Sequence, residues 1–535
     1  MDERTNADRR KQTPPPPEVM IFGSGACARK IAANLYDQGI NAWLAAREDS
    51  PPAAGQAEKM HWLTNIGLTA CHGFARNFEL KLTQKGSFLH QNVPAIVLAE
   101  DDDRSPNYAP YGLAPNPRVL SISSLEEKMH QASADDLFEK GARIVFLCGW
   151  HNDSHPVIAQ RMLAGCLHLQ SRSRVAAYFM TGNLKVAANG AEAQVQAAKR
   201  SGALFLKFTR DFPTIRTLAD GRFEIDYLDE LTRTPFQLTA DWVVVDETIG
   251  PGRHLDALAH GLATRQDSLG FAQSDNVHRM SNATNRRGIF VAGGSRGILS
   301  EAEQLADADQ VTLKVLAFLQ DLDAAPLPRV EIVRGRCARC LTCYRLCPHM
   351  AIAIGTRVSV VTDACQGCGI CVAGCPARAI EMEGLPIGAE VYRRLRKPDA
   401  NKEVAERMPK VMVFGCARSA GKARTLSRLS GHTLPRGVQF IEVPCGGTIS
   451  TGLLLEAFDA GADGVMLCTC HTDNCQSEIG NQVARRRADS ARNLLKGAGV
   501  ESDRLNITSV AANMGNEFTF MIHAFVDRIN ALNRS

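Results

Sequence analysis

Residues 337–348 read CARCLTCYRLCP, and residues 365–376 read CQGCGICVAGCP. Each run holds three cysteines separated by two residues and a fourth cysteine three residues later, directly before a proline. A cubane iron–sulfur cluster needs four thiolates around one small object, and this spacing lets a tight loop supply three of them. Because the fourth cysteine of each run completes the other cluster, the two runs predict two [4Fe–4S] clusters.

The crossed arrangement gives each cluster three cysteines from one run and one from the other. Structural zinc is the alternative, but it uses two C-x-x-C pairs and has no need of a doubled four-cysteine run. The region, about residues 330–386, resembles the bacterial two-cluster ferredoxin, which relays electrons. The two predicted ligand sets are Cys337, Cys340, Cys343 and Cys375, and Cys365, Cys368, Cys371 and Cys347.

The composition of the chain is that of an ordinary globular protein. Its 535 residues exceed a single core and predict several domains, and the near-balanced formal charge of +4 asks for no nucleic acid or anionic membrane surface. Residues 1–17 lack the apolar core of a secretory signal, and no stretch is apolar for long enough to span a bilayer. Thirteen of the 17 cysteines lie in tight groups from residue 337 onward. Cluster ligation in the cytoplasm is therefore expected, with any membrane association made through a partner subunit.

The strand and helix patterns predict an α/β fold on both sides of the cysteine runs. We expect a disordered tail over 1–17, a Rossmann-like domain that binds FAD or NAD(P) over 18–325, and the ferredoxin domain over 330–386. A linker over 387–409 and a small α/β domain over 410–535 follow. Predicted strands cover 19–22, 42–45, 143–148, 175–180, 204–208, 242–245, 289–292, 411–414, 440–443 and 464–467, with a last helix over 517–533.

A glycine turn follows the first predicted strand and opens a helix. Gly23 allows the tight turn, Gly25 lets the backbone approach a pyrophosphate, and Ala28 is small enough for close helix–strand packing. The phosphates would lie on the helix N-terminus. A vestigial Rossmann unit kept only for packing is the alternative. The ribose contact is ambiguous, because Glu48 suits it only if the strand is shifted and Arg47 suits a 2′-phosphate.

A second glycine-rich strand end favours FAD over NAD(P). The strand over 289–292 ends at Gly293 and Gly294, and flavoproteins with two dinucleotide-binding folds carry such a late strand near the flavin. Ser300 and Glu303 then form a predicted capping box that opens a helix. The usual acidic residue after the glycines is replaced by Ser295. An ordinary buried strand followed by a capped helix would give the same pattern.

Five cysteines beyond residue 410 lie near the ends of predicted strands. Strand ends gather at one edge of a small α/β sheet, so we expect these thiols to converge. Cys468 is left out of the set. It follows Leu467 in the predicted strand, and neighbouring side chains in a strand point to opposite faces. Four thiolates suit a [2Fe–2S] cluster and zinc almost equally. The predicted set is Cys416, Cys445, Cys470 and Cys475.

The other cysteines have simpler interpretations. Cys148, His151 and His155 lack a fourth ligand, so a loop without a metal is favoured. Small buried side chains account for Cys27, Cys71 and Cys166.

Residues 411–530 resemble the delta subunit of methyl-viologen-reducing hydrogenase. The resemblance is carried by FGC at 414–416, VPC at 443–445, GADGV at 461–465, the CH-x3-C motif at 470–475 and three arginines at 485–487. That family carries a [2Fe–2S] cluster, which implies iron at the four C-terminal cysteines. It often has a second cysteine three residues after the first, where this chain has Ser419.

Residues 19–386 resemble the A-type subunit of heterodisulfide reductase and its relatives. The resemblance is carried by GSGACA at 23–28, ADWVVV at 240–245, the glycine-rich 288–297 and the ferredoxin region. The A-type subunit has further cysteines for an additional cluster, and the matching residues 156–166 lack them. The whole chain is similar to the B-type subunit of the quinone-interacting membrane-bound oxidoreductase of sulfate-reducing bacteria, and to fused subunits of other anaerobic electron-transfer complexes.

These patterns and resemblances together predict an iron–sulfur flavoprotein subunit of a larger anaerobic redox complex. Electrons would pass between FAD, the two [4Fe–4S] clusters and the C-terminal cluster, and redox subunits linked to heterodisulfide reductase, hydrogenase or quinone would be the partners. One alternative is a self-contained reductase that oxidises NAD(P)H. Another is a scaffold protein that carries clusters without flavin.

Overall fold

The computed structural model describes residues 18–46, 61–131, 137–172, 175–184, 189–272, 282–320, 330–385, 392, 408–472 and 474–534. The predicted tail, Arg47, Glu48 and most of the linker over 387–409 lie outside these ranges. The chain divides into two compact units. One contains residues 1–99, 256–292 and 307–535, and the other contains residues 100–255 and 293–306.

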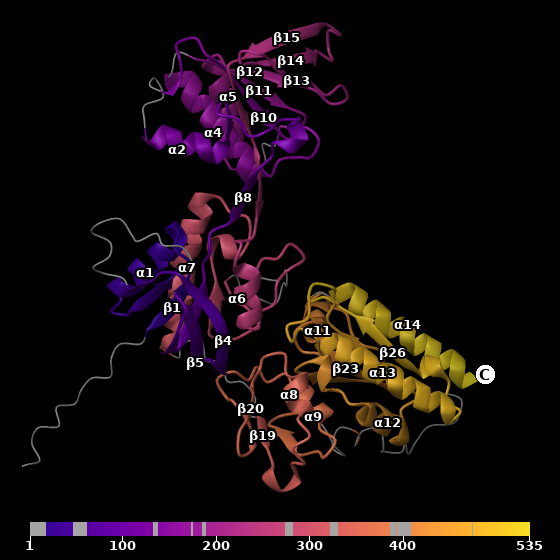
Figure 1. Cartoon of the computed structure of the whole chain (residues 1–535). Coiled ribbons are helices and arrows are strands. Elements are labelled where there is room, and N and C mark those ends of the chain that lie inside the picture. The colour runs from indigo at the N-terminus through magenta and orange to yellow at the C-terminus, as the bar shows by residue number, and fades with distance from the viewer. Residues whose placement is uncertain are drawn as a thin grey trace, which may run out of the picture. The chain divides into compact units, whose positions relative to one another are not determined.

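The first unit begins with a five-stranded parallel sheet in the order β18-β7-β1-β2-β3 (Figure 1). All four side chains of β1 are buried, as expected for a parallel strand covered on both faces. Apolar residues of α1 and of α7 pack together with these strands in one core. The elements are β1 (Val19–Phe22), α1 (Ala26–Asp37), β2 (Ala42–Ala45), β3 (His61–Leu63), β7 (Ala95–Leu98), β18 (Ile289–Val291) and α7 (Glu301–Leu319).

A three-stranded antiparallel sheet in the same unit has no counterpart among the predicted strands. It consists of β4 (Ile66–Phe74), β5 (Asn77–Gln84) and β6 (Ser87–Val93). Lys85 and Gly86, both at positive φ, make the tight turn between β5 and β6. The helix α6 (Leu255–Gly261) follows later in the chain.

The second unit is built on another five-stranded parallel sheet, in the order β12-β11-β10-β16-β9. Two parallel sheets with crossover helices confirm the predicted α/β class with two dinucleotide-binding-like folds. The sheet elements are β9 (Val119–Ser121), α2 (Ile122–Gln131), β10 (Arg143–Cys148), α4 (Pro156–Arg172), β11 (Ala176–Thr181), α5 (Ala191–Arg200), β12 (Leu204–Lys207) and β16 (Trp242–Val245). Two antiparallel ribbons complete the unit: β8 (Asp103–Pro106) with β17 (Glu247–Gly250), and β13 (Thr214–Thr217), β14 (Phe223–Leu228) and β15 (Pro235–Ala240).

The ferredoxin region of the first unit is an internal repeat. Its two cysteine loops each end in a short helix, and left-handed residues of the first loop recur 28 residues further on, such as Leu341 at φ 60° and Gly369 at φ 70°. Small antiparallel ribbons close the fold. The elements are β19 (Val330–Ile332), α8 (Thr342–Leu346), β20 (Ile352–Ile354), β21 (Val358–Val360), α9 (Ile370–Gly374) and β22 (Ile380–Met382).

The C-terminal region is a four-stranded parallel sheet in the order β24-β23-β25-β26. One face packs against α12 and α13, and the other packs against α11 and α14 (Figure 1). Parallel pairing brings the ends of these strands to one edge, as predicted. The elements are β23 (Val411–Cys416), α11 (Ala420–Leu429), β24 (Val438–Val443), η6 (Gly446–Thr448), α12 (Thr451–Asp459), β25 (Gly464–Thr469), α13 (Gly480–Gly497), β26 (Leu505–Ser509) and α14 (Gly515–Arg534).

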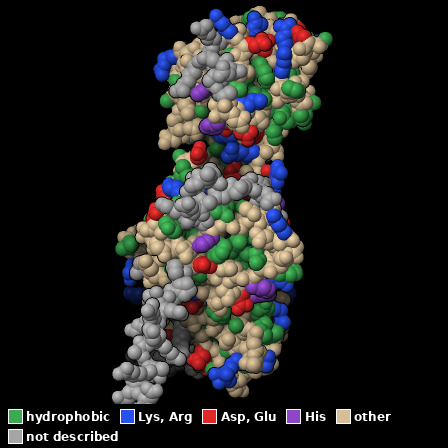
Figure 2. Space-filling model, turned by 60° about the vertical axis from the view of Figure 1, so that its left-hand side comes forward, with side chains coloured by type: hydrophobic (Ala, Val, Ile, Leu, Met, Phe, Trp, Pro, Cys, Tyr) green, Lys and Arg blue, Asp and Glu red, His purple; other side chains and the backbone are tan. Residues whose placement is uncertain are grey.

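The surface agrees with the balanced formal charge. On the face that Figure 2 shows, acidic, basic and apolar side chains are interspersed. In the part of the chain that the structure describes, no helix combines the length and apolar character needed to cross a bilayer.

Candidate cofactor sites

The first predicted ligand set surrounds one small cavity in the ferredoxin region. Cys337, Cys340, Cys343 and Cys375 all line it, together with apolar side chains such as Ile332 and Ile380. The main-chain N–H of Ala379 donates to the Cys375 sulfur at 3.2 Å. The residues at this cavity therefore fit the cluster that their spacing predicts.

The second predicted set is also brought together. Burial raises the pKa of the Cys371 thiol, and negative charge on Cys368, Cys347 and Cys365 raises it further. The main-chain N–H of Ala351 donates to the Cys347 sulfur at 3.3 Å, repeating the bond made to Cys375 in the other set. Each group thus combines three cysteines of one run with the fourth cysteine of the other run. The ligand assignment itself stays a prediction.

The four C-terminal cysteines form a third, more deeply buried group. Cys416, Cys445, Cys470 and Cys475 are each no more than 4% exposed and share one cluster of buried side chains. The sulfurs of Cys416 and Cys470 lie 3.6 Å apart. At Gly480, a Cβ would collide with the Cys445 sulfur and lie 3.2 Å from that of Cys475, so only glycine leaves room for both thiols.

The thiols of this third group are close enough to hydrogen-bond to one another, as the Cys416 and Cys470 sulfurs do. Cys416 and Cys475 accept hydrogen bonds from neighbouring thiols, which lowers the pKa of each. Cys445 and Cys470 donate such bonds, which raises the pKa of each. Closely packed thiols that bond in this way suit a ligand that takes thiolates. Among the described residues, no three His, Cys, Asp or Glu side chains are already arranged to hold a single ion. Four sulfurs fit either a [2Fe–2S] cluster or zinc.

Two neighbours of this group follow the sequence argument. Cys468 is fully buried in a separate apolar core with Val411, Met466 and Phe518, as its position in β25 predicts. Ser419, at the place where the hydrogenase family often has a cysteine, is fully buried, and its hydroxyl has no hydrogen-bond partner among the described residues.

The second ferredoxin loop packs directly on the third cysteine group. Ile370 is the first residue of α9 and lies two residues after Cys368. Its side chain is fully buried in the same cluster as the four C-terminal cysteines. The Thr448 hydroxyl donates to the Cys368 carbonyl oxygen at 2.8 Å. The two cysteine groups are therefore held by one continuous packed contact.

Sequence reasoning missed the polar residues that support these groups. The Arg487 guanidinium donates to the carbonyl oxygens of Gly447 and Ile370 and so joins α13 to both cysteine-bearing loops. The Asn481 amide donates to three successive carbonyl oxygens, at Cys470, His471 and Thr472, and fixes the loop that carries Cys470. Only the run of arginines at 485–487 gave any signal, and it did not distinguish Arg487 from its neighbours.

The glycine turn after β1 leads directly into α1, as predicted. Gly23 has φ 143°, a conformation that favours glycine, and Ala28 is fully buried against the sheet. Gly25 is the N-cap of helix α1 and no side chain caps the helix there, and the dipole at a helix N-terminus favours an anion. These residues fit a pyrophosphate. Glu48, the proposed ribose contact, lies outside the described residues.

The later glycines make close backbone contacts in the second unit. At Gly294, a Cβ would collide with the backbone of Asp102 and lie 2.9 Å from the Glu100 carbonyl oxygen. The buried Ser295 hydroxyl accepts the Glu100 N–H at 2.8 Å. Gly293 is also buried. The contact of Gly293 and Gly294 with a flavin stays a prediction.

The capping box at the start of α7 is confirmed. The Ser300 N–H donates to the Glu303 carboxylate at 2.8 Å, and the Glu303 N–H donates back to the Ser300 hydroxyl at 3.4 Å. The bonds that the Ser300 N–H and hydroxyl donate to the Glu303 carboxylate lower the pKa of that carboxyl.

The side chains of Cys148, His151 and His155 have separate structural roles. Cys148 is buried in the apolar core of the second unit, and His151 packs on Phe212 with ring centroids 4.6 Å apart. The His155 ring accepts the Val157 N–H at the start of α4. Cys27 and Cys166 are buried small side chains, as expected. Cys71 differs from that expectation, because it is only partly buried.

These sites define an iron–sulfur protein built on Rossmann-type sheets, and comparison with known proteins places its parts more narrowly. Residues 411–533 match the family described as methyl-viologen-reducing hydrogenase, delta subunit. Residues 358–381 match the 4Fe-4S binding domain. The chain thus joins a part similar to the A-type subunit of heterodisulfide reductase to a domain of the hydrogenase delta type. The likeness to the B-type subunit of the quinone-interacting oxidoreductase stays a prediction.

Two curated relatives illustrate the match. The chain is 30% identical over 318 residues to the A-type subunit of ferredoxin:CoB-CoM heterodisulfide reductase from Methanosarcina mazei, covering 58% of this chain and 39% of that protein. It is 28% identical over 124 residues to the D-type iron-sulfur subunit of the F420-non-reducing hydrogenase vhc from Methanococcus voltae, covering 23% and 86%. The chain therefore spans about two fifths of the length of the reductase relative.

Solved structures resemble the chain more distantly. Thioredoxin reductase of T. acidophilum has a TM-score of 0.40 at 12% identity, covering 58% of this chain and 100% of that one. Thioredoxin reductase of Lactococcus lactis has a TM-score of 0.39 at 15% identity, covering 57% and 99%.

Proposed function

We propose that the chain is an electron-transfer subunit of a larger anaerobic redox complex in the cytoplasm. It would pass electrons between FAD at the glycine turn, two [4Fe–4S] clusters in the ferredoxin region and a [2Fe–2S] cluster at the C-terminal cysteines. When bound, a flavin exchanges electron pairs and the clusters exchange single electrons. Heterodisulfide reductase-like, hydrogenase-linked or quinone-linked subunits would be its partners.

The observation that carries this proposal is the packed contact between Cys368 and the third cysteine group. A cluster held by Cys365, Cys368, Cys371 and Cys347 would lie beside a cluster held by the C-terminal cysteines, separated by little more than the Ile370 side chain and its neighbours. A rigid, desolvated contact of this kind keeps two redox centres at one distance. The cluster on Cys337, Cys340, Cys343 and Cys375 would then be the one farther from the C-terminal cluster.

The residues of the chain would bind and insulate the cofactors. The main-chain N–H groups of Ala351 and Ala379 would donate to cluster sulfurs and so raise the reduction potentials. The turn from Gly23 to Ala28 would hold the pyrophosphate of the dinucleotide on the N-terminus of α1. Burial of the four C-terminal cysteines would keep water away from the third cluster.

The test is the iron, zinc and flavin content of the anaerobically purified full chain, together with EPR spectra of the reduced protein. We expect iron, flavin and two kinds of cluster signal. A preparation with zinc and no iron would exclude the relay. Iron without flavin would favour the scaffold protein, and oxidation of NAD(P)H by the isolated chain would favour the self-contained reductase.

A further inference from the structure

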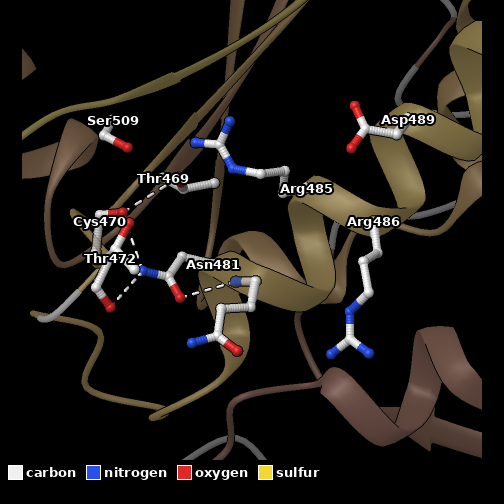
Figure 3. A pocket seen from close by; sticks show the side chains of 9 residues that line it. Thr469, Cys470, Thr472, Asn481, Arg485, Arg486, Asp489 and Ser509 are labelled. Atoms are coloured by element: carbon white, nitrogen blue, oxygen red, sulfur yellow. Dashed lines mark hydrogen bonds between the residues drawn. The ribbon is translucent and has the colours of Figure 1, made fainter.

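A polar cavity of about 470 Å³ opens beside the C-terminal cysteine group (Figure 3). It lies at the ends of β25 and β26 and at the start of α13. We call it the basic cavity, and its important lining residues are Cys470, Thr472, Gln482, Arg485, Arg486 and Ser509. Figure 3 shows Arg485 extending along the cavity toward Thr469 and Ser509.

The basic cavity is rich in hydrogen-bond donors and positive charge. Arg485 and Arg486 are exposed, and neither has an ion-pair or hydrogen-bond partner for its side chain among the described residues. The one carboxylate of the lining, Asp489, is already paired with Arg492 at 2.8 Å. The Asn481 amide already donates its hydrogen bonds to the loop that carries Cys470. The cavity therefore presents two uncompensated guanidinium groups beside free hydroxyl and amide groups.

The cavity also lies on a direct path between solvent and the third cysteine group. Each of the four cysteines is almost completely buried, so electrons reach them from outside only across a thin layer of protein. Cys470 lines the cavity, and its sulfur lies 3.6 Å from that of Cys416. A group bound in the cavity would contact the residue that carries a predicted cluster ligand.

The geometry points to the basic cavity as the docking surface for a redox protein whose own centre is ringed by acidic side chains. This inference rests on the proposed function, because it assigns the place where electrons enter or leave the C-terminal cluster. Carboxylates of the partner would pair with Arg485 and Arg486 and reach the hydroxyl groups of Thr472 and Ser509. The partner's redox centre would thereby be aligned with Cys470.

Charge complementarity favours a protein partner over a free anion. Two guanidinium groups on an exposed rim act at long range and steer an acidic surface into register, which raises the association rate at low salt. Arginine forks pair with carboxylates in a fixed orientation, as alignment of two redox centres requires.

The test measures reduction of the full-length anaerobic protein by a small acidic two-cluster ferredoxin, followed at the C-terminal centre by freeze-quench EPR. The variant Arg485→Glu/Arg486→Glu, which reverses two charges, is compared with Lys496→Glu, which reverses one charge about 16 Å further along α13. We expect the double variant to react about ten-fold more slowly at low salt and to lose most of the salt dependence. Lys496→Glu should behave as the wild type.

A basic cytochrome c serves as the opposite probe, and we expect the double variant to be oxidised by it faster than the wild type. Equal rates in all three proteins, or a wild-type rate that does not change with salt, would overturn the docking surface. Tight binding of inorganic phosphate, measured by calorimetry and lost in the double variant, would identify a free-anion site instead. The proposed function is judged separately, because the EPR signal of the C-terminal centre must be present in every variant.

Discussion

The Thr448 hydroxyl donates a hydrogen bond of 2.8 Å to the Cys368 carbonyl oxygen. This bond joins the turn after Cys445 to the second cysteine loop of the ferredoxin region. Arg487 and Ile370 reinforce the same contact. Two cysteine groups that are separate in the sequence are therefore parts of one packed structure.

The fit between the two loops depends on the absence of a side chain at Gly369. Gly369 and Gly384 have nearly the same positive φ, 70° and 69°, so an alanine at either position costs about 1 kcal/mol of backbone strain. Only at Gly369 would the new Cβ meet Thr448, at 2.9 Å, whereas nothing lies within 4 Å at Gly384. We expect Gly369→Ala to weaken the magnetic interaction between neighbouring reduced clusters in EPR, and Gly384→Ala to leave it unchanged. Equal spectra would show that the contact does not set the cluster spacing.

The crossed ligand sets make the two ferredoxin clusters distinguishable by mutation. Cys347→Ala should remove the cluster beside the C-terminal group, and with it the spin coupling to the C-terminal centre. Cys375→Ala should remove the other cluster and preserve that coupling. EPR of the reduced variants at low temperature checks both. The reverse pattern would mean that each run ligates its own cluster.

The third group is tested by two buried cysteines with opposite expected roles. Cys445→Ala should abolish the C-terminal cluster signal and lower the iron content by about two atoms per chain. Cys468→Ala removes a thiol that is equally buried but lies in the apolar core, so the signal should survive with a stability loss of about 1 kcal/mol. Survival of the signal in Cys445→Ala would remove Cys445 from the ligand set.

The nucleotide turn can be tested with the two glycines that flank α1. Gly23 and Gly39 both have positive φ, at 143° and 76°, so each alanine variant should lose roughly 1–3 kcal/mol of stability. Only Gly23 lies in the predicted phosphate turn. We expect Gly23→Ala to lose bound flavin, measured by absorbance of the released cofactor, while Gly39→Ala retains it. Retention of flavin in both variants would place the cofactor elsewhere.

The sequence was most informative where a local pattern has one structural meaning. Alternation in β25 placed Cys468 on the face opposite to Leu467, and the predicted strands over 19–22, 143–148 and 242–245 coincide with β1, β10 and β16. The alternation of Phe78, Leu80 and Leu82 before a Lys-Gly turn is also typical of a strand, but no strand was predicted there. The β4–β6 sheet was therefore predictable in principle.

The tertiary contacts could not be predicted from one sequence. Thr448, Asn481 and Arg487 are ordinary polar residues, and their importance arises only when distant segments meet. Gly294 matched a flavin-type pattern, and the structure shows a close backbone contact with Asp102 as one reason for the glycine. Local patterns therefore identified the cysteines, whereas the contact that joins their groups required the fold.

The most direct test of the account is the cofactor content of the full chain purified without oxygen. The account predicts about ten iron atoms and one flavin per chain, with EPR signals of both [4Fe–4S] and [2Fe–2S] type after reduction by dithionite. A colourless protein that contains zinc and no iron would contradict it.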